Sequence, residues 1–359
     1  MTPLLTFAPG PSKISQETKE DVTRAITDGI CEISHRSQQF RDISTDAVEG
    51  LRTFLEIPNE YGVYFTASAT EAMDILVRNA VDKTTCHFTC GSFSDVFFET
   101  AFYLWKDANK QDVPWGDKND YSQKCAGNPE LITITMNETS TGVMCSQEDI
   151  ALARKNHPDA LIAVDITSMA AMKKLSIGDA DAWLFSVQKG FGLPAGMGVL
   201  IVNDRVHGRA QELEASKINQ AGIYTFTEYK RNADKGNETI CTPNVLSIYL
   251  LSKQVQRWNN RGGIEQKERE TIQKSSVLYQ ALDSSKRFRV FPSDNASRSH
   301  TVVCGTGDPA AIQQLHSKAN AAGMQIGSGY GRLRETTFRI ACFPAVTQSD
   351  VERVLPLLG

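Results

Sequence analysis

The sequence predicts an α/β protein, with a large domain built on a mainly parallel central sheet and a smaller C-terminal α+β domain. Over the first 240 residues, short apolar runs alternate with amphipathic helical stretches. Many of these runs are continuously apolar, as expected for strands that are covered on both faces. After about residue 240, two long helical stretches precede short strands. We therefore expect a large domain over 15–250 and a small domain over 251–359, with segment 1–14 near the functional site.

The predicted strands of the large domain are five apolar runs. They occupy residues 61–65, 131–136, 160–167, 181–187 and 197–203. Helical stretches between them include 70–81 and 146–157. The second of these begins at Ser146, with Asp149 three residues later, which is a typical helix cap. Alternation of strand and helix favours a layered structure with parallel strands.

The C-terminal part has a different pattern. Residues 246–282 are typical of two helices interrupted at an Arg-Gly-Gly break. The runs FRVF, TVVC and TFRIAC predict strands, and DPAAIQQLHSKANAAG predicts a helix between them. This order indicates a separate, smaller α+β unit.

Composition excludes several classes of function. The net charge of −4 and the pI of about 5.9 provide no basic field for nucleic acid or an anionic membrane. No apolar run is long enough to span a bilayer, and the first 15 residues do not resemble a signal peptide. The eight cysteines and six histidines are dispersed without a CxxC pair, so no zinc site is expected. Dispersed thiols without a signal peptide favour the cytoplasm.

Two charged residues follow predicted strands. Asp165 ends one apolar run, and Lys189 follows the next in the stretch SVQKGFGLPAGMG. Since the carboxyl ends of parallel strands meet at one sheet edge, the two side chains would lie close together. A lysine that attaches to an aldehyde and a carboxylate that keeps a pyridine nitrogen protonated suit pyridoxal phosphate chemistry. The alternative is that Asp165 caps a helix and Lys189 lies in a surface turn.

Three further motifs lie where a flat, phosphorylated cofactor would need contacts. In FTASATEA, backbone N–H groups at residues 68–70 begin a helix and would form a phosphate cup. Phe93 follows a Gly-Ser turn and would stack on a ring. Thr139 in NETSTG would contact a ring substituent. The alternatives are a capped helix without ligand, a core phenylalanine and a polar turn.

Basic residues in two segments suit anionic substrates. His35 and Arg36 stand side by side in SHRSQQF and would bind a phosphate or carboxylate, or else lie in a solvated loop. Arg339 stands inside the apolar run TFRIAC, where a buried guanidinium requires an anionic partner. That partner is either the carboxylate of a substrate or a carboxylate of the chain itself, in a structural salt bridge.

The joint order of these motifs resembles the class V aminotransferases, which share the aspartate-aminotransferase fold (fold type I). The motifs are FAPGP, SHRS, SATEA, GSF, NETSTG, VDITS, SVQKG, CTPN and FRIA, over residues 7–344. SHRSQQF, NET and QKG are most similar to the phosphoserine aminotransferases. The resemblance implies pyridoxal 5′-phosphate as the cofactor, anionic amino and keto acids as substrates, and a cytoplasmic homodimer with active sites shared across the interface.

The resemblance also implies roles for individual residues. Lys189 would attach the cofactor and carry protons, and Asp165 would pair with the ring nitrogen. The other implied cofactor contacts are Ser68, Ala69, Thr70, Phe93, Thr139, Gln188 and, reaching the cofactor of the partner subunit, Thr242. The implied substrate contacts are His35 and Arg36 for a distal phosphate across the dimer, Arg339 for the α-carboxylate, and Arg332.

The sequence departs from the family pattern mainly on the substrate side. The phosphate cup ASATEAM lacks the arginine that it often carries, and Pro9 stands where a serine often precedes Gly-Pro. Arg332 and Leu333 replace a His-Arg pair, and Cys241 stands where asparagine is usual. Arg332 would replace the lost contact.

The resemblance therefore implies conversion of 3-phosphohydroxypyruvate and L-glutamate to O-phospho-L-serine and 2-oxoglutarate, in L-serine biosynthesis. One alternative is a class V enzyme that uses alanine or serine with glyoxylate. Another is a cofactor-binding regulator without turnover, against which the intact Asp165–Lys189 pair argues.

Overall fold

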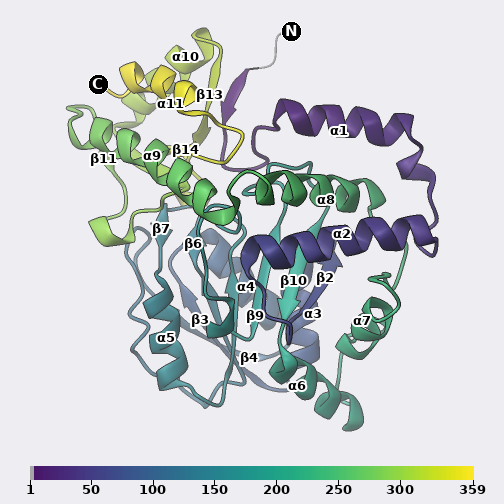
Figure 1. Cartoon of the computed structure of the whole chain (residues 1–359). Coiled ribbons are helices and arrows are strands. Elements are labelled where there is room, and N and C mark those ends of the chain that lie inside the picture. The colour runs from purple at the N-terminus through teal and green to yellow at the C-terminus, as the bar shows by residue number, and fades with distance from the viewer. Residues whose placement is uncertain (1–3) are drawn as a thin grey trace.

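The computed structural model describes residues 4–359, and within them the strands form one seven-stranded, one five-stranded and one two-stranded sheet (Figure 1). The larger sheet has the strand order β2-β10-β9-β8-β5-β3-β4. Its strands are β2 (Gly62–Thr66), β3 (Thr84–Thr89), β4 (Asp107–Asp112), β5 (Leu131–Thr135), β8 (Leu161–Asp165), β9 (Ala182–Ser186) and β10 (Gly198–Val202). The two-stranded sheet joins β6 (Asn137–Glu138) to β7 (Val143–Met144).

The larger sheet is mainly parallel, as predicted. Strands β9, β8, β5, β3 and β4 pair in parallel. Strand β10 runs antiparallel to both of its neighbours, β9 and β2. Because β9 and β10 form a hairpin, their connecting loop, which carries Lys189, lies at the carboxyl end of β9.

Successive residues of the central strands enter two different hydrophobic cores. In β8, Ile162 and Val164 belong to one core, whereas Leu161 and Ala163 belong to the other. Both faces of the sheet are therefore buried, which explains why these strands are continuously apolar.

Two groups of helices cover the sheet (Figure 1). Helices α1 (Gln16–Thr27), α2 (Gln38–Leu55), α5 (Gln147–Asn156) and α8 (Val245–Asn259) contribute to the first core. Helices α3 (Ala69–Ala80), α4 (Ser92–Tyr103), α6 (Asp204–Ala215) and α7 (Phe226–Ala233) contribute to the second. The predicted cap of α5 is confirmed, since Ser146 Oγ accepts from Asp149 N at 3.3 Å.

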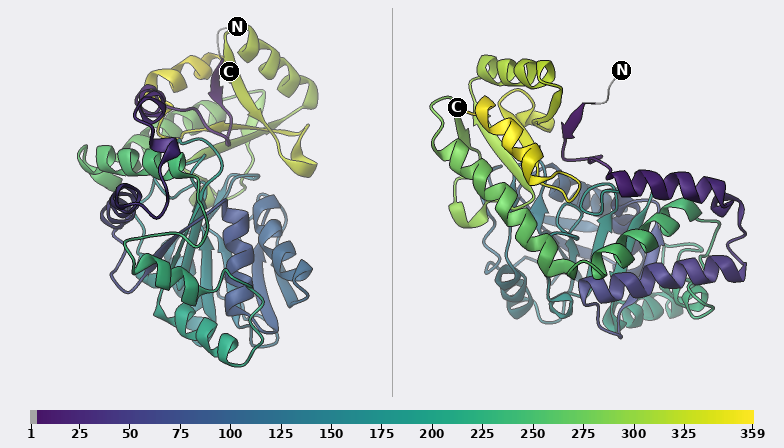
Figure 2. Two further views of the ribbon diagram at one scale, coloured as in Figure 1. Left: turned by 90° about the vertical axis from the view of Figure 1, so that its right-hand side faces the viewer. Right: turned by 45° about the horizontal axis from the view of Figure 1, so that its top comes forward.

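The five-stranded sheet combines the two ends of the chain (Figure 2). Its order is β1-β13-β14-β12-β11, and the N-terminal strand β1 pairs in parallel with β13. Its strands are β1 (Leu5–Phe7), β11 (Phe288–Val290), β12 (Val302–Gly307), β13 (Met324–Ser328) and β14 (Thr337–Ala341). The remaining helices are α9 (Gly263–Asp283), α10 (Pro309–Ala321) and α11 (Gln348–Val354).

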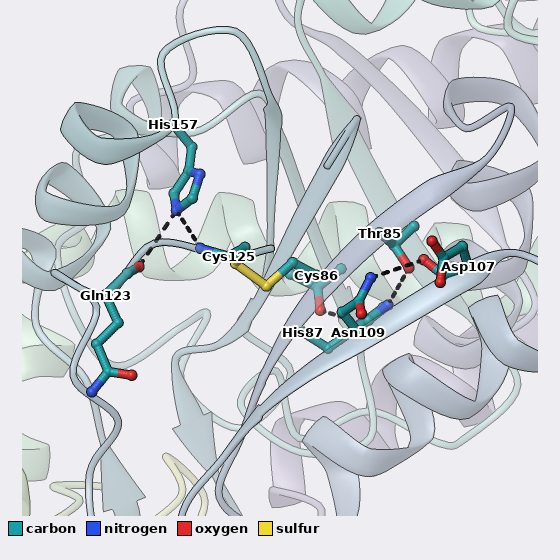
Figure 3. The surroundings of a disulfide bond; sticks show 9 residues. Thr85, Cys86, His87, Asp107, Asn109, Gln123, Cys125 and His157 are labelled. Atoms are coloured by element: carbon teal, nitrogen blue, oxygen red, sulfur yellow. Dashed lines mark hydrogen bonds between the residues drawn. A yellow bond between two sulfur atoms is a disulfide. The ribbon is translucent and has the colours of Figure 1, made fainter. Parts of the chain in front are cut away.

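The structure corrects the expectation that the cysteines are dispersed free thiols. Cys86 on β3 forms a disulfide with Cys125, with Cα atoms 6.2 Å apart (Figure 3). The two residues are 39 positions apart and meet because the segment before β5 folds back beside β3. Cysteine usage therefore does not support a reducing compartment.

None of the helices within residues 4–359 combines the length and the apolar composition that crossing a membrane requires.

Candidate active site

Polar side chains gather at the carboxyl edge of the larger sheet. Thr135 and Asp165 are neighbours in the parallel register of β5 and β8, and Asp165 pairs in turn with Leu184 of β9. Side chains along a strand alternate between its two faces, and Leu131, Ala163 and Leu184 lie in the core that α3 and α4 cover. Thr135, Asp165 and Ser186 are an even number of residues from these positions and therefore lie on the same face. The ends of three strands therefore meet two helix N-termini, where partial positive charge collects.

Lys189 lies in the loop between β9 and β10 and is 7% exposed. Its Nζ donates to Thr139 Oγ1 at 3.1 Å and lies 4.2 Å from the centre of the Phe93 ring. Burial lowers the pKa of the Lys189 amine to about 8. The N-terminal segment packs against this lysine, because Ser12 Oγ donates to the Lys189 carbonyl at 3.0 Å. Residues 1–3 of that segment lie outside the described residues.

Asp165 is a buried carboxyl group at the end of β8. Burial raises its pKa above the ordinary value, while the backbone N–H of Thr167, which donates at 2.8 Å, and the charge of Lys189 act in the opposite direction. A cationic partner would stabilise the ionised form of such a group.

Arg339 on β14 brings the second sheet into the site. Its Nη1 donates to the Thr139 carbonyl at 3.1 Å and its Nε to the Ser328 carbonyl at 2.8 Å. No carboxylate within residues 4–359 forms an ion pair with this buried guanidinium, so the structural salt bridge left open by the sequence is not present. Among the described residues, the Arg339 guanidinium therefore donates to two backbone carbonyls and has no anionic partner.

The proposed phosphate cup begins helix α3. Ala69 N donates to Ser186 Oγ at 2.7 Å, and Ser68 Oγ accepts from Glu71 N at 3.1 Å. A Cβ on Gly198 would lie 2.5 Å from the Ser68 carbonyl carbon, so a glycine there lets the cup approach β10. The helix cap that the sequence offered as the alternative to a phosphate cup is therefore present. Phosphate binding by the N–H groups of residues 68–70 remains a prediction.

His35, Arg36 and Thr242 form a separate cluster. His35 Nδ1 and Thr242 Oγ1 are 3.4 Å apart, although 207 positions separate the two residues. Arg36 pairs with Glu238 at 2.6 Å. Within the described part of the chain, no hydrogen bond or ion pair joins any of these residues to Lys189. The structure therefore brings Lys189, Thr139, Phe93 and Arg339 together. Thr242 and Glu238, the partner of Arg36, instead line a cavity with Ala67 and Glu71 at the start of α3.

Comparison with known proteins gives the family. The model of the "Aminotransferase class-V" family matches residues 7–354. The chain belongs to the class-V aminotransferase family. It is an aminotransferase, and its cofactor is pyridoxal phosphate.

This class-V enzyme is similar in sequence or structure to several named proteins. The chain is 28% identical to a phosphoserine aminotransferase of Rhodococcus opacus, over 97% of this chain and 92% of the relative. It is 34% identical to a phosphoserine aminotransferase from Cytophaga hutchinsonii of known crystal structure. The two structures match with a TM-score of 0.94, over 100% of this chain and 99% of the other. An alanine–glyoxylate aminotransferase structure from Nostoc sp. shares the fold, with 16% identity, a TM-score of 0.87 and coverage of 100% and 95%. The expected aspartate-aminotransferase-like fold is confirmed.

The residues around Lys189 fit a polar cofactor. Buried side-chain oxygens without a hydrogen-bond partner in the described chain concentrate on the segments that carry Asp165 and Thr139. Four of the five such oxygens are Thr135 Oγ1, Asn137 Oδ1, Thr141 Oγ1 and Thr167 Oγ1, and the fifth, Gln348 Oε1, belongs to α11. Because buried polar atoms are normally paired, such a concentration indicates a place for polar ligand atoms.

Sequence reasoning missed Glu138, which is fully buried beside Thr139. Its carboxylate accepts from the backbone N–H of Phe93 at 3.1 Å and of Ser94 at 2.8 Å, which begin α4. It also accepts from Ser140 N at 3.0 Å and Ser140 Oγ at 2.6 Å. Glu138 therefore caps a helix from 44 positions away and fixes Phe93 relative to Thr139. Its position in the motif NET is the one local signal for Glu138 in the sequence.

A Glu138→Gln variant tests this arrangement. We expect the free energy of unfolding to fall by about 2–4 kcal/mol, because an amide replaces one carboxylate oxygen and turns an N–H group toward buried donors. Affinity for pyridoxal phosphate should fall as well, since Phe93 loses its support. Denaturant unfolding and cofactor titration measure the two effects. Glu99→Gln, an exposed change on the same helix, serves as the control. Equal behaviour of the two variants would refute the positioning role.

Proposed function

We propose that this enzyme transfers an amino group between L-glutamate and 3-phosphohydroxypyruvate, giving O-phospho-L-serine and 2-oxoglutarate, as a step of L-serine biosynthesis. The observation that carries the proposal is the buried Arg339 guanidinium, which has no carboxylate partner in the described chain and bonds to Thr139 beside Lys189. Both amino acids offer an α-carboxylate for Arg339 and a distal anion for other basic residues. The names of the relatives in Rhodococcus opacus and Cytophaga hutchinsonii support this substrate.

Four residues of the chain have separate roles in the proposed reaction. Bound pyridoxal phosphate supplies an electron sink for the pair left when the substrate loses its α-proton. Lys189, whose amine has a pKa of about 8, accepts and returns that proton at Nζ near neutral pH. Asp165 provides the negative charge that favours a protonated ring nitrogen. Arg339 holds the α-carboxylate, and Thr139 orients both Lys189 and Arg339.

The first test is the absorption spectrum of the pyridoxal phosphate-loaded protein before and after O-phospho-L-serine is added. Conversion of the band of the lysine-linked cofactor to that of the amine form supports phosphoserine as donor. A spectrum that responds to alanine or serine but ignores phosphoserine would favour the second candidate, an aminotransferase that uses glyoxylate. One observation favours that candidate, because Glu238 already neutralises Arg36 within the chain.

We further propose a homodimer in which His35, Arg36 and Thr242 reach the site of the partner subunit. The support is that these residues form one cluster that no hydrogen bond or ion pair joins to the Lys189 of their own chain within residues 4–359. We also propose that the enzyme is cytoplasmic. The Cys86–Cys125 disulfide argues against this location, because disulfides are rare in a reducing compartment.

An Arg36→Ala variant should raise the KM for O-phospho-L-serine about 10- to 100-fold, because a charged hydrogen bond to the phosphate is lost. Turnover of L-alanine, which has no distal anion, should change little. Arg41→Ala is the matched control, since Arg41 pairs with the other oxygen of Glu238. Equal losses for the two amino acids would contradict a phosphate role.

Mixed dimers distinguish a role across the interface from a role within one chain. A dimer of one Lys189→Ala chain and one Arg36→Ala chain retains one site with an intact Lys189 and an intact Arg36 only if Arg36 acts across the interface. We expect this hybrid to recover the wild-type KM for phosphoserine. A hybrid with the KM of the Arg36→Ala homodimer would show that Arg36 acts within its own chain.

A further inference from the structure

We propose that Trp115 is a positioning residue that aims Arg332 at the distal anion of the substrate. This inference rests on the proposed function, because it assigns that anion to a second arginine besides Arg36. It concerns Trp115 in the segment after β4, which is part of none of the motifs that the sequence analysis identified.

The contact between the two side chains is direct. The Arg332 guanidinium carbon lies 4.0 Å from the centre of the Trp115 ring. Arg332 is exposed, and within residues 4–359 it takes part in no ion pair, so stacking on the Trp115 ring is the interaction that restrains its side chain. A cation held over a tryptophan face keeps its charge and its outward N–H groups, which leaves it ready to bind an anion.

The loop that carries Arg332 lies over the residues around Lys189. The Tyr330 ring lies 5.1 Å from the Phe93 ring, and the Arg339 guanidinium lies 5.5 Å from the Tyr330 ring. A Cβ on Gly331 would lie 3.2 Å from Ser92 Oγ and 3.5 Å from Trp115. The loop therefore rests on both the start of α4 and Trp115, and it places Arg332 on the same turn of chain that touches Phe93.

Trp115 is itself anchored to the C-terminal part of the chain. Ser293 N donates to the Gly116 carbonyl at 3.3 Å, and Ser293 Oγ donates to Asp117 Oδ1 at 2.7 Å. The turn that carries Trp115 thus has a fixed position against the segment before β12. A fixed ring can hold Arg332 in one place at little entropic cost to substrate binding.

Arg339 therefore contacts the Tyr330 ring, and Arg332, two residues after Tyr330 in the chain, is held on the Trp115 ring. Neither arginine has a carboxylate partner within residues 4–359. This arrangement suits a substrate with two anionic groups. Arg339 would bind the α-carboxylate and Arg332 the phosphate or second carboxylate.

The experiment compares Trp115→Ala, Trp115→Phe and Arg332→Ala with two controls. Arg334→Ala removes an exposed arginine of the same loop, and Trp105→Ala removes a tryptophan that is 93% exposed. For each variant we would measure kcat and KM with O-phospho-L-serine. Intrinsic fluorescence would give the Kd for 3-phosphoglycerate, which carries a carboxylate and a phosphate but has no amino or keto group to react.

We expect Trp115→Ala and Arg332→Ala each to raise both the KM and the Kd by about tenfold, with kcat within about twofold of wild type. Trp115→Phe should recover part of the loss because a ring remains. The double variant should be no worse than Arg332→Ala alone, since Trp115 acts through Arg332.

Additive losses in the double variant, or an unchanged KM and Kd in Trp115→Ala, would overturn the inference while leaving the proposed function intact. A loss in Arg334→Ala as large as that in Arg332→Ala would overturn it as well. A wild-type enzyme that transaminates another amino acid but not phosphoserine would overturn the proposed function, and the inference with it.

Discussion

A Lys189→Ala variant is expected to lose amine transfer by at least about 10³-fold, with the fold retained. General acid–base catalysis by a positioned side chain contributes about 10²–10⁴-fold, and the variant also loses the point of attachment for the cofactor. Activity assays, together with mass spectrometry of borohydride-reduced protein, measure the two losses. A cofactor attached to a lysine other than Lys189 would contradict this assignment.

Lys274 offers a matched control. It is also buried, and burial also lowers the pKa of its amine to about 8, but its Nζ donates to the carbonyls of Phe343 and Val346. Lys274→Ala should therefore reduce stability while leaving cofactor attachment unchanged. We expect Lys189 and not Lys274 to react, because Lys189 lies beside Phe93 and Thr139 whereas the Lys274 amine is bound to two backbone carbonyls.

The pH dependence of attachment follows from the lowered pKa of Lys189. Only the neutral amine is a nucleophile, so cofactor-free protein should capture pyridoxal phosphate faster as the pH rises through about 8 and level off above it. An ordinary lysine would continue to gain above pH 10.

An Arg339→Ala variant is expected to lower kcat/KM for L-glutamate and for O-phospho-L-serine alike, by about 30- to 5,000-fold. Truncating one partner of a buried charged pair costs about 2–5 kcal/mol, and both substrates carry the α-carboxylate. Arg339→Lys should recover little, because an ammonium group cannot form the two-pronged contact of a guanidinium. Steady-state kinetics with both substrates measures the effect, and the thermal midpoint controls for folding. A loss confined to phosphoserine would show that Arg339 binds the phosphate instead.

The central strands were predictable because their chemistry is local. In β8 and β9, both faces are buried, so every position is apolar until Asp165 and Ser186 at the edge. The hairpin that reverses β10 then brings Lys189 to that same edge.

Other strands were not predictable from hydrophobicity. Strand β3 reads TTCHFT, and its buried His87 bonds to Thr85 and Thr133, a compensation that only the assembled sheet reveals. Strand β4 is a polar edge strand. Strand β1 has three residues and acquires its partner, β13, from the far end of the chain.

The candidate site likewise contains some residues that the sequence predicted and others that it did not. Lys189, Asp165, Thr139 and Arg339 stand next to apolar runs, where polar side chains are conspicuous in the sequence. Glu138 was missed because its partners at the start of α4 lie 44 positions away. The Cys86–Cys125 pair was missed because its spacing matches no motif. The roles of the residues that the sequence singled out remain predictions that the variants above test.

The most direct test of the central claim follows the amino group itself. The enzyme, loaded with pyridoxal phosphate, would be mixed with 3-phosphohydroxypyruvate and L-glutamate labelled with ¹⁵N at the α-amino group. Mass spectrometry would then follow the label. We predict ¹⁵N-labelled O-phospho-L-serine and an equal amount of 2-oxoglutarate. Label that stays in glutamate with 3-phosphohydroxypyruvate, but passes to glycine when glyoxylate is the acceptor, would contradict the proposed substrate.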